Sequence, residues 1–218
     1  MTLKPGFTLY TVTFKEVGSA DPVNVNMIKV FQNGSPWSTG NKVWMYKMDT
    51  EGVYGTSYNY RSGKGGWCQG TKLVEDLTIR NGEAVCINNA TGSGNIQLQV
   101  SGEVVLTPVS YTIQNGYSLI GNITPVKINA NEMKAFCRAT GTTDEWVEVS
   151  TGNKVWLYKM DTEGVYGTSY NYRSGKGGWC QGTKLTEDLM LEPGESVCIN
   201  NALTGYEVQL RYASPISK

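Results

Sequence analysis

Histidine is absent from this chain of 218 residues. Its absence removes the commonest general base, the Ser/His and Cys/His nucleophile pairs, and histidine-ligated zinc or iron. The five cysteines include no CxxC pair, which argues against a zinc or redox site. We therefore expect a protein that is not an enzyme, with no catalytic residue, no metal ligand and no cofactor.

Long apolar runs and an excess of charge are also missing. No apolar run approaches the ~18 residues that suggest a membrane-spanning helix, so we expect no membrane insertion. The net charge is zero and the pI is about 6.3, which argues against nucleic acid as a partner because such binding needs a basic field. Charged residues make up only 17%, whereas glycine (26) and tyrosine (13) are frequent. This composition indicates a β-rich, turn-rich protein and not a disordered one.

One stretch occurs twice. Residues 38–73 reappear as residues 150–185 with a single change, from Met45 to Leu157, at an offset of 112 residues (150 − 38). Two units of this size lie in the usual range for domains. We expect a first domain at 1–106 and a second at 107–218.

Most of the chain has the alternating pattern of antiparallel strands separated by turns. Asn33-Gly34 and the stretch 49–52 have turn composition, and the stretch 42–60 is predicted to form a hairpin. The one helix candidate is 131–138, for which we find no counterpart in the first unit. The predicted fold class is all-β, with two tandem antiparallel β-sandwich or small β-barrel domains related by internal duplication.

The repeat is uneven. The opening parts of the units, 7–37 and 117–149, have diverged until only their pattern remains, while the repeated block is nearly identical. Gene conversion or a core that tolerates little change would explain this. A surface used twice is the alternative, because cores accept volume-conserving changes and would not preserve polar turns.

The block carries the candidate ligand-binding residues. Flat aromatic rings with polar tips suit sugars, peptides or a partner protein, although cross-strand aromatics also stabilise hairpins. Trp44 lies in an apolar strand and is assigned to the core. The predicted ligand-binding residues are Tyr58, Tyr60, Arg61, Lys64 and Trp67, with their equivalents Tyr170, Tyr172, Arg173, Lys176 and Trp179.

Cysteines and carboxylates leave alternatives open. Cys68 and Cys86 match Cys180 and Cys198, so each unit has one candidate disulfide, or else two buried free thiols; Cys137 is left over. The acidic pairs are Asp49/Glu51, Glu75/Asp76, Asp161/Glu163 and Glu187/Asp188. Adjacent strand residues point to opposite faces, which disfavours a hydrolase, and no ligand spacing supports a calcium site.

The second unit carries Gly-Tyr-Ser-Leu-Ile-Gly-Asn at 116–122, Val-Trp-Leu-Tyr-Lys at 155–159, Gly178-Trp179 and a Pro-Gly-Glu turn at 193–195. It resembles repeated β-modules of predicted secreted or surface proteins in Verrucomicrobia-type and Lentisphaerae-type bacteria. The likeness covers most of the second unit and, more loosely, the first. It departs at Val197-Cys198, where the family often has an aromatic pair. The resemblance implies an extracellular setting and no particular activity.

These observations predict a secreted or cell-surface protein. We recognise no signal peptide at Met1, so the chain would begin after a removed signal, and an intracellular location stays open. We expect a structural or surface module that works by binding or self-assembly through repeated aromatic faces, with a protein partner or a second copy. The alternative is a lectin-like protein that binds glycans at two equivalent sites.

Overall fold

The computed structural model describes residues 1–15, 23–37, 42–48, 54–79, 82–92, 94–104, 109–150, 154–160 and 166–212. Within these ranges the chain is all-β, as predicted, and its helical segments are single turns of 3-10 helix. They are η1 (Val25–Met27), η2 (Ser62–Lys64), η3 (Ala130–Glu132) and η4 (Ser174–Lys176). No helix among the described residues is long and apolar enough to cross a membrane.

The first half, residues 1–106, contains a six-stranded and a four-stranded antiparallel sheet. The six-stranded sheet has the order β10 (Lys72–Leu73), β9 (Gly66–Gln69), β8 (Tyr54–Arg61), β7 (Val43–Met48), β12 (Ala84–Asn89), β2 (Gly6–Thr11). The four-stranded sheet has the order β1 (Thr2–Leu3), β13 (Ile96–Gln99), β5 (Lys29–Gln32), β6 (Ser35–Pro36). Two short pairs complete the half: β11 (Thr78–Ile79) with β4 (Val23–Asn24), and β14 (Glu103–Val104) with β3 (Phe14–Lys15).

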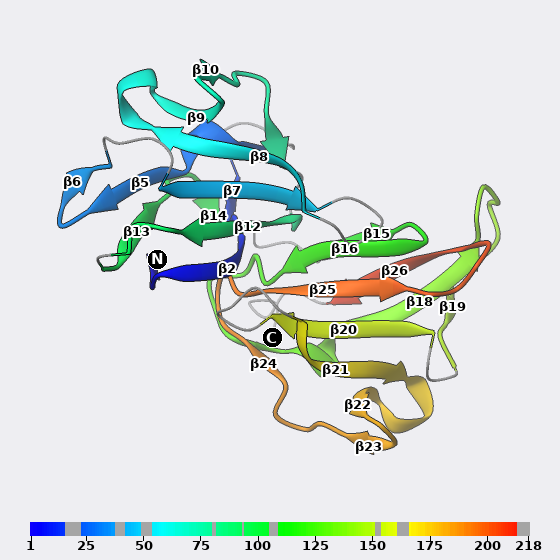
Figure 1. The fold of residues 1–218 in the computed structure, drawn as a ribbon. Coiled ribbons are helices and arrows are strands. Elements are labelled where there is room, and N and C mark those ends of the chain that lie inside the picture. Colours follow the sequence, from blue (N-terminus) through cyan, green and yellow to red (C-terminus); the bar gives the residue numbers. More distant parts are fainter. Residues whose placement is uncertain are drawn as a thin grey trace.

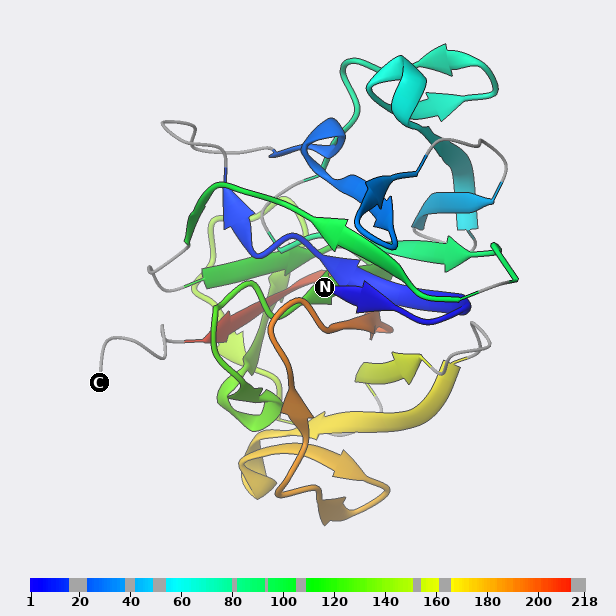
Figure 2. The same cartoon turned by 90° about the vertical axis from the view of Figure 1, so that its left-hand side faces the viewer.

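The second half, residues 107–218, has sheets of the same sizes and the same strand order (Figures 1 and 2). The six-stranded sheet has the order β16 (Gly116–Gly121), β25 (Ser196–Asn201), β20 (Val155–Met160), β21 (Tyr166–Arg173), β22 (Gly178–Gln181), β23 (Lys184–Leu185). The four-stranded sheet has the order β15 (Val109–Ile113), β26 (Tyr206–Tyr212), β18 (Lys134–Ala139), β19 (Val147–Glu148). β17 (Ile128–Asn129) pairs with β24 (Met190–Leu191).

The core of each half lies between its two large sheets. In the first half, Val30 and Leu98 of the four-stranded sheet share one buried cluster with Met45 and Ile87 of the six-stranded sheet. Trp67 joins the layers because its indole N–H donates to the carbonyl of Ile28 at 3.1 Å. Strand alternation explains the arrangement, since every second residue faces the core.

The structure confirms one predicted turn and contradicts the predicted helix. Asn33 and Gly34 both have positive φ, 50° and 78°, in the two-residue turn between β5 and β6. The proposed turn at 49–52 lies outside the described residues. The stretch 131–138 is not a helix: it forms the end of η3 and most of β18, and η1 with β5 is its counterpart in the first half.

Tertiary contacts explain why the helix does not form. The Asn131 side chain donates to the carbonyl of Thr186 at 2.7 Å and accepts from the backbone N–H of Trp179 at 2.8 Å. Met133 and Ala135 are both buried, which is the two-residue period of a strand. These long-range contacts override a local helical pattern that could bury nothing on its own.

The two halves pack along β2 and β12 of the first and β16 and β25 of the second (Figure 1). A small buried cluster crosses this boundary; its members are Leu9, Ala84, Cys86, Leu119 and Cys198. Matched backbone hydrogen bonds accompany it, from the Thr11 N–H to the Gly194 carbonyl and from the Gly121 N–H to the Gly82 carbonyl, each 3.1 Å. The halves are therefore joined by both apolar and backbone contacts.

Each half also places one tyrosine against a glycine of the other half's turn. The Tyr111 ring of β15 covers Gly82 so closely that a β-carbon at Gly82 would overlap it. On the other side Tyr10 of β2 lies beside Gly194, 3.6 Å from the position a β-carbon would take. The two contacts occupy equivalent turns although the tyrosines come from different strands.

Candidate functional site

The repeated block forms β7, β8 and β9, and their pairing sorts its side chains between two faces. Trp44 lies opposite Asn59, and Met45 lies opposite Tyr58. Directly paired residues share a face, so Trp44 and Asn59 are on one side of the sheet and Met45 and Tyr58 on the other. Met45 is fully buried, which identifies its face as the core face.

Four predicted ligand-binding aromatics are core residues, and the prediction is wrong for them. Tyr60 is 3% exposed, and Trp67, Tyr172 and Trp179 are fully buried. The rings of Tyr60 and Trp67 meet edge to face with centroids 5.3 Å apart, and their equivalents repeat this geometry. Because they fill the space between the sheets, these rings cannot contact a ligand at the surface.

The environment of Tyr172 fits a structural role. Burial raises the pKa of its phenol, and the hydrogen bond to the Glu148 carboxylate, 2.5 Å long, raises it further. The hydroxyl therefore stays protonated and donates to β19 of the opposite sheet. Tyr172 thus ties the two sheets together.

The other predicted residues are divided between the two faces. Tyr58 is 9% exposed and Tyr170 is partly buried, both against the core clusters. Lys64 and Lys176 are exposed in η2 and η4. Arg61 and Arg173 lie on the face opposite the core, where the guanidinium Nε donates to the side-chain oxygen of Asn59 at 2.8 Å and of Asn171 at 2.7 Å. Arg61 and Arg173 thus reach the outer face of the sheet, whereas the four buried aromatic residues do not.

That outer face carries a concave surface in each half, which we call the Trp44 surface and the Trp156 surface. Their volumes are about 630 and 760 Å³. The Trp44 surface is lined by Trp44, Gly55, Thr56, Ser57, Asn59, Gln69 and Gly70. The Trp156 surface is lined by Trp156, Gly167, Thr168, Ser169, Asn171, Gln181 and Gly182, together with Arg173 and Thr183. All seven residues of the first surface recur in the second.

Asn59 builds the floor of the Trp44 surface. Its side-chain nitrogen donates to the carbonyls of Cys68 at 3.2 Å and Gly70 at 3.0 Å, while its oxygen accepts from Arg61. Asn59 is 1% exposed, so its hydrogen-bonding groups are used within the protein. It holds the turn at Gln69–Gly70 against β8 and leaves ligand contacts to its neighbours. Asn171 makes the same bonds to Cys180 and Gly182.

The remaining polar groups are available to a ligand. Among the described residues, the side chains of Thr56, Ser57 and Gln69 make no hydrogen bond within the protein, and neither do those of their equivalents. Trp44 is partly exposed beside them. Gly70, at φ +61°, has no atom within 4 Å of where a β-carbon would lie, which leaves the surface open. Among the described residues, the lining of the Trp44 surface therefore offers one indole ring, two hydroxyls and one amide and includes no charged side chain, whereas the lining of the Trp156 surface also includes Arg173.

Trp44 is the residue that sequence reasoning missed. It was assigned to the core because its strand is apolar, but Val43 and Met45 supply the core contacts and Trp44 points the other way. The alternation of Val43, Trp44 and Met45 was a usable signal, since only one of two adjacent strand positions faces the core. Composition alone could not decide which of the two.

All five cysteines are described, and none of them forms a disulfide. Cys68 and Cys86 are both buried, but β8 and β7 lie between their strands. Three strand spacings put them about 14 Å apart, whereas the α-carbons of a disulfide lie within about 7 Å. The same strand order separates Cys180 from Cys198. The structure therefore supports the alternative of buried thiols that form no disulfide.

The acidic pairs do not assemble into a site among the residues described. Glu75, Asp76, Glu187 and Asp188 are all exposed, while the pairs at 49/51 and 161/163 lie outside the described residues. Within the described ranges, no group of three histidine, cysteine or carboxylate side chains could hold a metal ion.

Comparisons with known proteins identify no relative. No protein-family model, no curated protein and no solved structure matches the chain.

Proposed function

We propose that this protein is a non-catalytic binding protein with two equivalent sites, the Trp44 surface and the Trp156 surface, and that the ligand is a glycan. The proposal includes two tandem antiparallel β-sandwich domains, 1–106 and 107–218, related by duplication. It retains the predicted repeated aromatic faces but moves them from Tyr60 and Trp67 to the opposite side of the sheet.

The recurrence of the concave surface carries this proposal. All seven residues that line the Trp44 surface have identical equivalents around Trp156. The one substitution inside the block, Met45 to Leu157, falls at a position that is fully buried in both halves. A core accepts such a volume-conserving change. The variable position thus lies in the core, and the identical positions include the whole lining.

The chemistry of the lining favours a neutral ligand with many hydroxyl groups. An indole ring provides a flat apolar face for the C–H groups of a sugar, and uncharged hydroxyls and amides can exchange hydrogen bonds with its hydroxyls. Thr56, Ser57 and Gln69 surround Trp44 in this way. Among the described residues that line the Trp44 surface, none has a side chain that could act as a general acid or base, and the Trp156 surface adds only one ionisable side chain, that of Arg173, whose guanidinium stays charged.

Glycan arrays on the wild-type protein and on the double variant Trp44→Ala/Trp156→Ala test the proposal. Removing both rings should weaken binding ~30-fold or more, because central aromatic anchors dominate interface energies. Each single variant should halve the stoichiometry seen by calorimetry and leave the affinity of the other site unchanged. Trp146→Ala is the matched control, since Trp146 is a partly exposed tryptophan outside both surfaces.

Self-assembly of a structural surface protein is the second candidate. The short strands β10 and β23 form edges of the two six-stranded sheets, and unpaired edges are where sheets associate. Concentration-dependent assembly seen by light scattering, without any glycan bound on the array, would favour this candidate over the first. An extracellular location belongs to either proposal and rests on the resemblance; finding the native protein only in the intracellular fraction would remove it.

A further inference from the structure

The outward face of the second four-stranded sheet carries an arginine that the first half lacks. Arg211 of β26 lies opposite Lys134 of β18, and further along the same strands Gln209 lies opposite Phe136. Leu210, between the two β26 residues, is fully buried, so Arg211 and Gln209 lie on the face away from the core. The Arg211 guanidinium lies over the Phe136 ring, 4.5 Å from its centre, and its Nε donates to the side-chain oxygen of Gln209. The orientation of the guanidinium is therefore fixed from two sides.

Arg211 is a cation of this face that lacks an anionic partner within the described chain. The neighbouring Arg138 is paired with the Glu207 carboxylate at 2.6 Å. The other carboxylate of the face, that of Glu148, accepts the hydrogen bond from the Tyr172 hydroxyl. Among the residues that the structure describes, no carboxylate forms an ion pair with Arg211. Because Nε is already bonded, the two terminal nitrogens of the Arg211 guanidinium are the donors left for a ligand.

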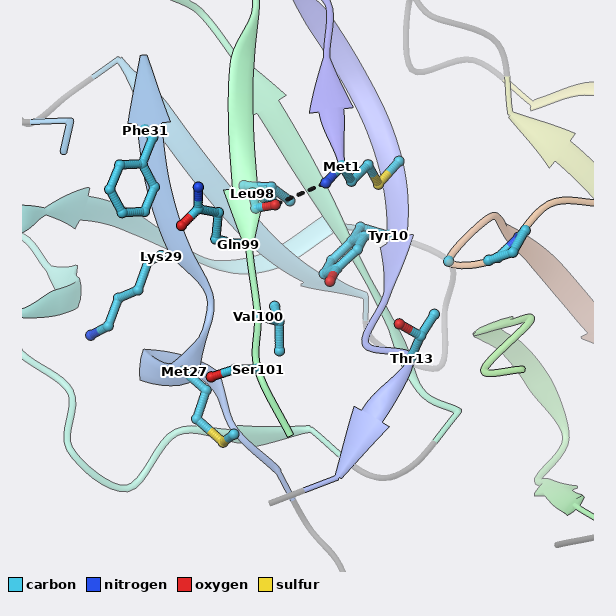
Figure 3. A pocket seen from close by; sticks show the side chains of 12 residues that line it. Met1, Tyr10, Thr13, Met27, Lys29, Phe31, Leu98, Gln99, Val100 and Ser101 are labelled. Carbon is cyan, nitrogen blue, oxygen red and sulfur yellow. Dashed lines mark hydrogen bonds between the residues drawn. The ribbon is translucent and has the colours of Figure 1, made fainter. Parts of the chain in front are cut away.

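The first half has the same face without the arginine (Figure 3). Gln99 stands at the place of Arg211, at the repeat offset of 112 residues (211 − 99), and pairs with Lys29 as Arg211 pairs with Lys134. Gln99, Lys29 and Phe31 all line a pocket of about 810 Å³ in the first half. An uncharged amide thus replaces the guanidinium there. The arginine site therefore occurs once in the chain, whereas the concave surfaces described above occur twice.

Uncharged polar groups lie beside Arg211. The neighbouring strand β15 places Ser110 opposite Arg211 and Thr112 opposite Gln209. Both residues are exposed, and their hydroxyls bond to no residue that the structure describes. β26 is paired on both sides, with β15 and with β18, so its backbone cannot accept an added peptide strand. A ligand on this face is recognised through side-chain groups alone, which are a guanidinium, two hydroxyls and an amide.

We propose that this face binds the carboxylate of an acidic sugar, a uronic acid residue, at Arg211. The two terminal guanidinium nitrogens donate to the two carboxylate oxygens, which is the bidentate arrangement that arginine favours. Ser110 and Thr112 exchange hydrogen bonds with the hydroxyls of the sugar ring, because neighbouring strands are only about 4.8 Å apart and one ring covers that span. Trp146 is already engaged by two cations of the protein, Arg138 at 4.4 Å and Arg211 at 5.7 Å from the ring centre, and we assign it no ligand contact. This site is separate from the two concave surfaces and does not depend on the function proposed for them.

Titration with tetragalacturonate, followed by proton–nitrogen NMR of the arginine Nε–H groups, tests the proposal. The matched control ligand is the fully methyl-esterified tetragalacturonate, which keeps the ring hydroxyls but carries no charge. We expect the acid to shift the Arg211 signal and to occupy a single site per chain, and the ester to leave the signal unchanged. Arg211→Gln, which introduces the residue found at Gln99, should weaken binding of the acid ~10-fold or more, because hydrogen bonds between charged groups are among the stronger ones. Lys4→Gln, which removes one charge from an exposed position in the first half, should leave binding unchanged.

An Arg211 signal that does not move at saturating acid, or that moves equally with the ester, would overturn the proposal, as would unchanged affinity in a folded Arg211→Gln variant. The titration of the wild-type protein decides the question even if that variant melts early. The peptide acetyl-Glu-Gly-Glu-amide offers carboxylates without sugar hydroxyls, and equal binding of this peptide would refute the sugar as ligand. Binding of the acid should survive in the Trp44→Ala/Trp156→Ala variant. Its loss there would assign the acid to the concave surfaces and overturn the Arg211 site, whereas failure of neutral glycans on the array would count only against the proposed function.

Discussion

Gly82 offers a test of how the two halves pack, because the equivalent glycine provides its own control. Gly82 and Gly194 occupy equivalent turns and have similar positive φ angles, 86° and 78°. A β-carbon at Gly82 would overlap the Tyr111 ring of the other half. A β-carbon at Gly194 would find its nearest atoms at 3.5–3.7 Å, which is ordinary contact. Replacing either glycine by alanine therefore adds similar backbone strain, but only the replacement of Gly82 also creates a steric clash.

The magnitudes separate the two variants. A left-handed backbone conformation costs an alanine about 1–2 kcal/mol, and this applies to both. Inserting a methyl group into a packed site costs about 1–3 kcal/mol more, and this applies only to Gly82→Ala. We expect Gly194→Ala to lower the free energy of unfolding by about 1–2 kcal/mol and Gly82→Ala by about 2–5 kcal/mol.

Urea denaturation followed by tryptophan fluorescence measures both free energies. Combining Gly82→Ala with Tyr111→Ala should show coupling, because the ring that causes the clash is gone and the double variant is more stable than the sum of the single effects predicts. Equal destabilisation by Gly82→Ala and Gly194→Ala, with no coupling to Tyr111, would refute the packing of β15 against the first half.

Three further predictions follow from individual side chains. Burial raises the pKa of Tyr10 from 10.0 to about 12, so the folded state favours the protonated phenol. The contribution of this protonated phenol to the stability of the folded state is complete below pH 10 and is lost as the pH rises toward 12. Urea titrations between pH 9 and 12 should therefore show a shallower loss of stability in Tyr10→Phe than in the wild type, with Tyr206→Phe, an exposed tyrosine, as the control. The intact mass should be the same with and without reductant, and a mass lower by two hydrogens in the unreduced sample would mean that a disulfide exists. Cys137, which is half-buried, should react with a thiol reagent before the four fully buried cysteines. Met45→Leu and Leu157→Met should each change the free energy of unfolding by less than about 1.5 kcal/mol. Each substitution places the residue of one half in the equivalent buried position of the other half. A larger loss of stability would mean that the two cores differ in shape.

Local patterns predicted the parts of the fold that depend on local chemistry. Strand alternation and the Asn33-Gly34 turn were readable because turn residues and two-residue periods act over a few positions. The stretch 131–138 was misread because its apolar residues also fit a helical period. Only the pairing of β18 with β26 and the hydrogen bonds of Asn131 select the strand.

The candidate site was predicted as a region but not as a set of residues. The repeated block contains both concave surfaces, and Arg173, one of the predicted ligand-binding residues, lines one of them. Trp67 and Tyr60 were predicted to bind a ligand because flat aromatic rings with polar tips suit sugars, peptides or a partner protein, yet both fill the core. A single strand shows which residues share a face, but its partner sheet decides which face is buried.

The sequence by itself determined that the chain is all-β and that one block occurs twice, because strand periodicity and self-similarity are properties of residue order. Tertiary structure alone decided which side of the repeated hairpin meets solvent, and so moved the candidate site from Trp67 to Trp44. It also decided that Cys68 and Cys86 lie too far apart to pair. Each of these depends on which strands become neighbours, and neighbours are chosen by long-range packing that no local stretch of sequence contains.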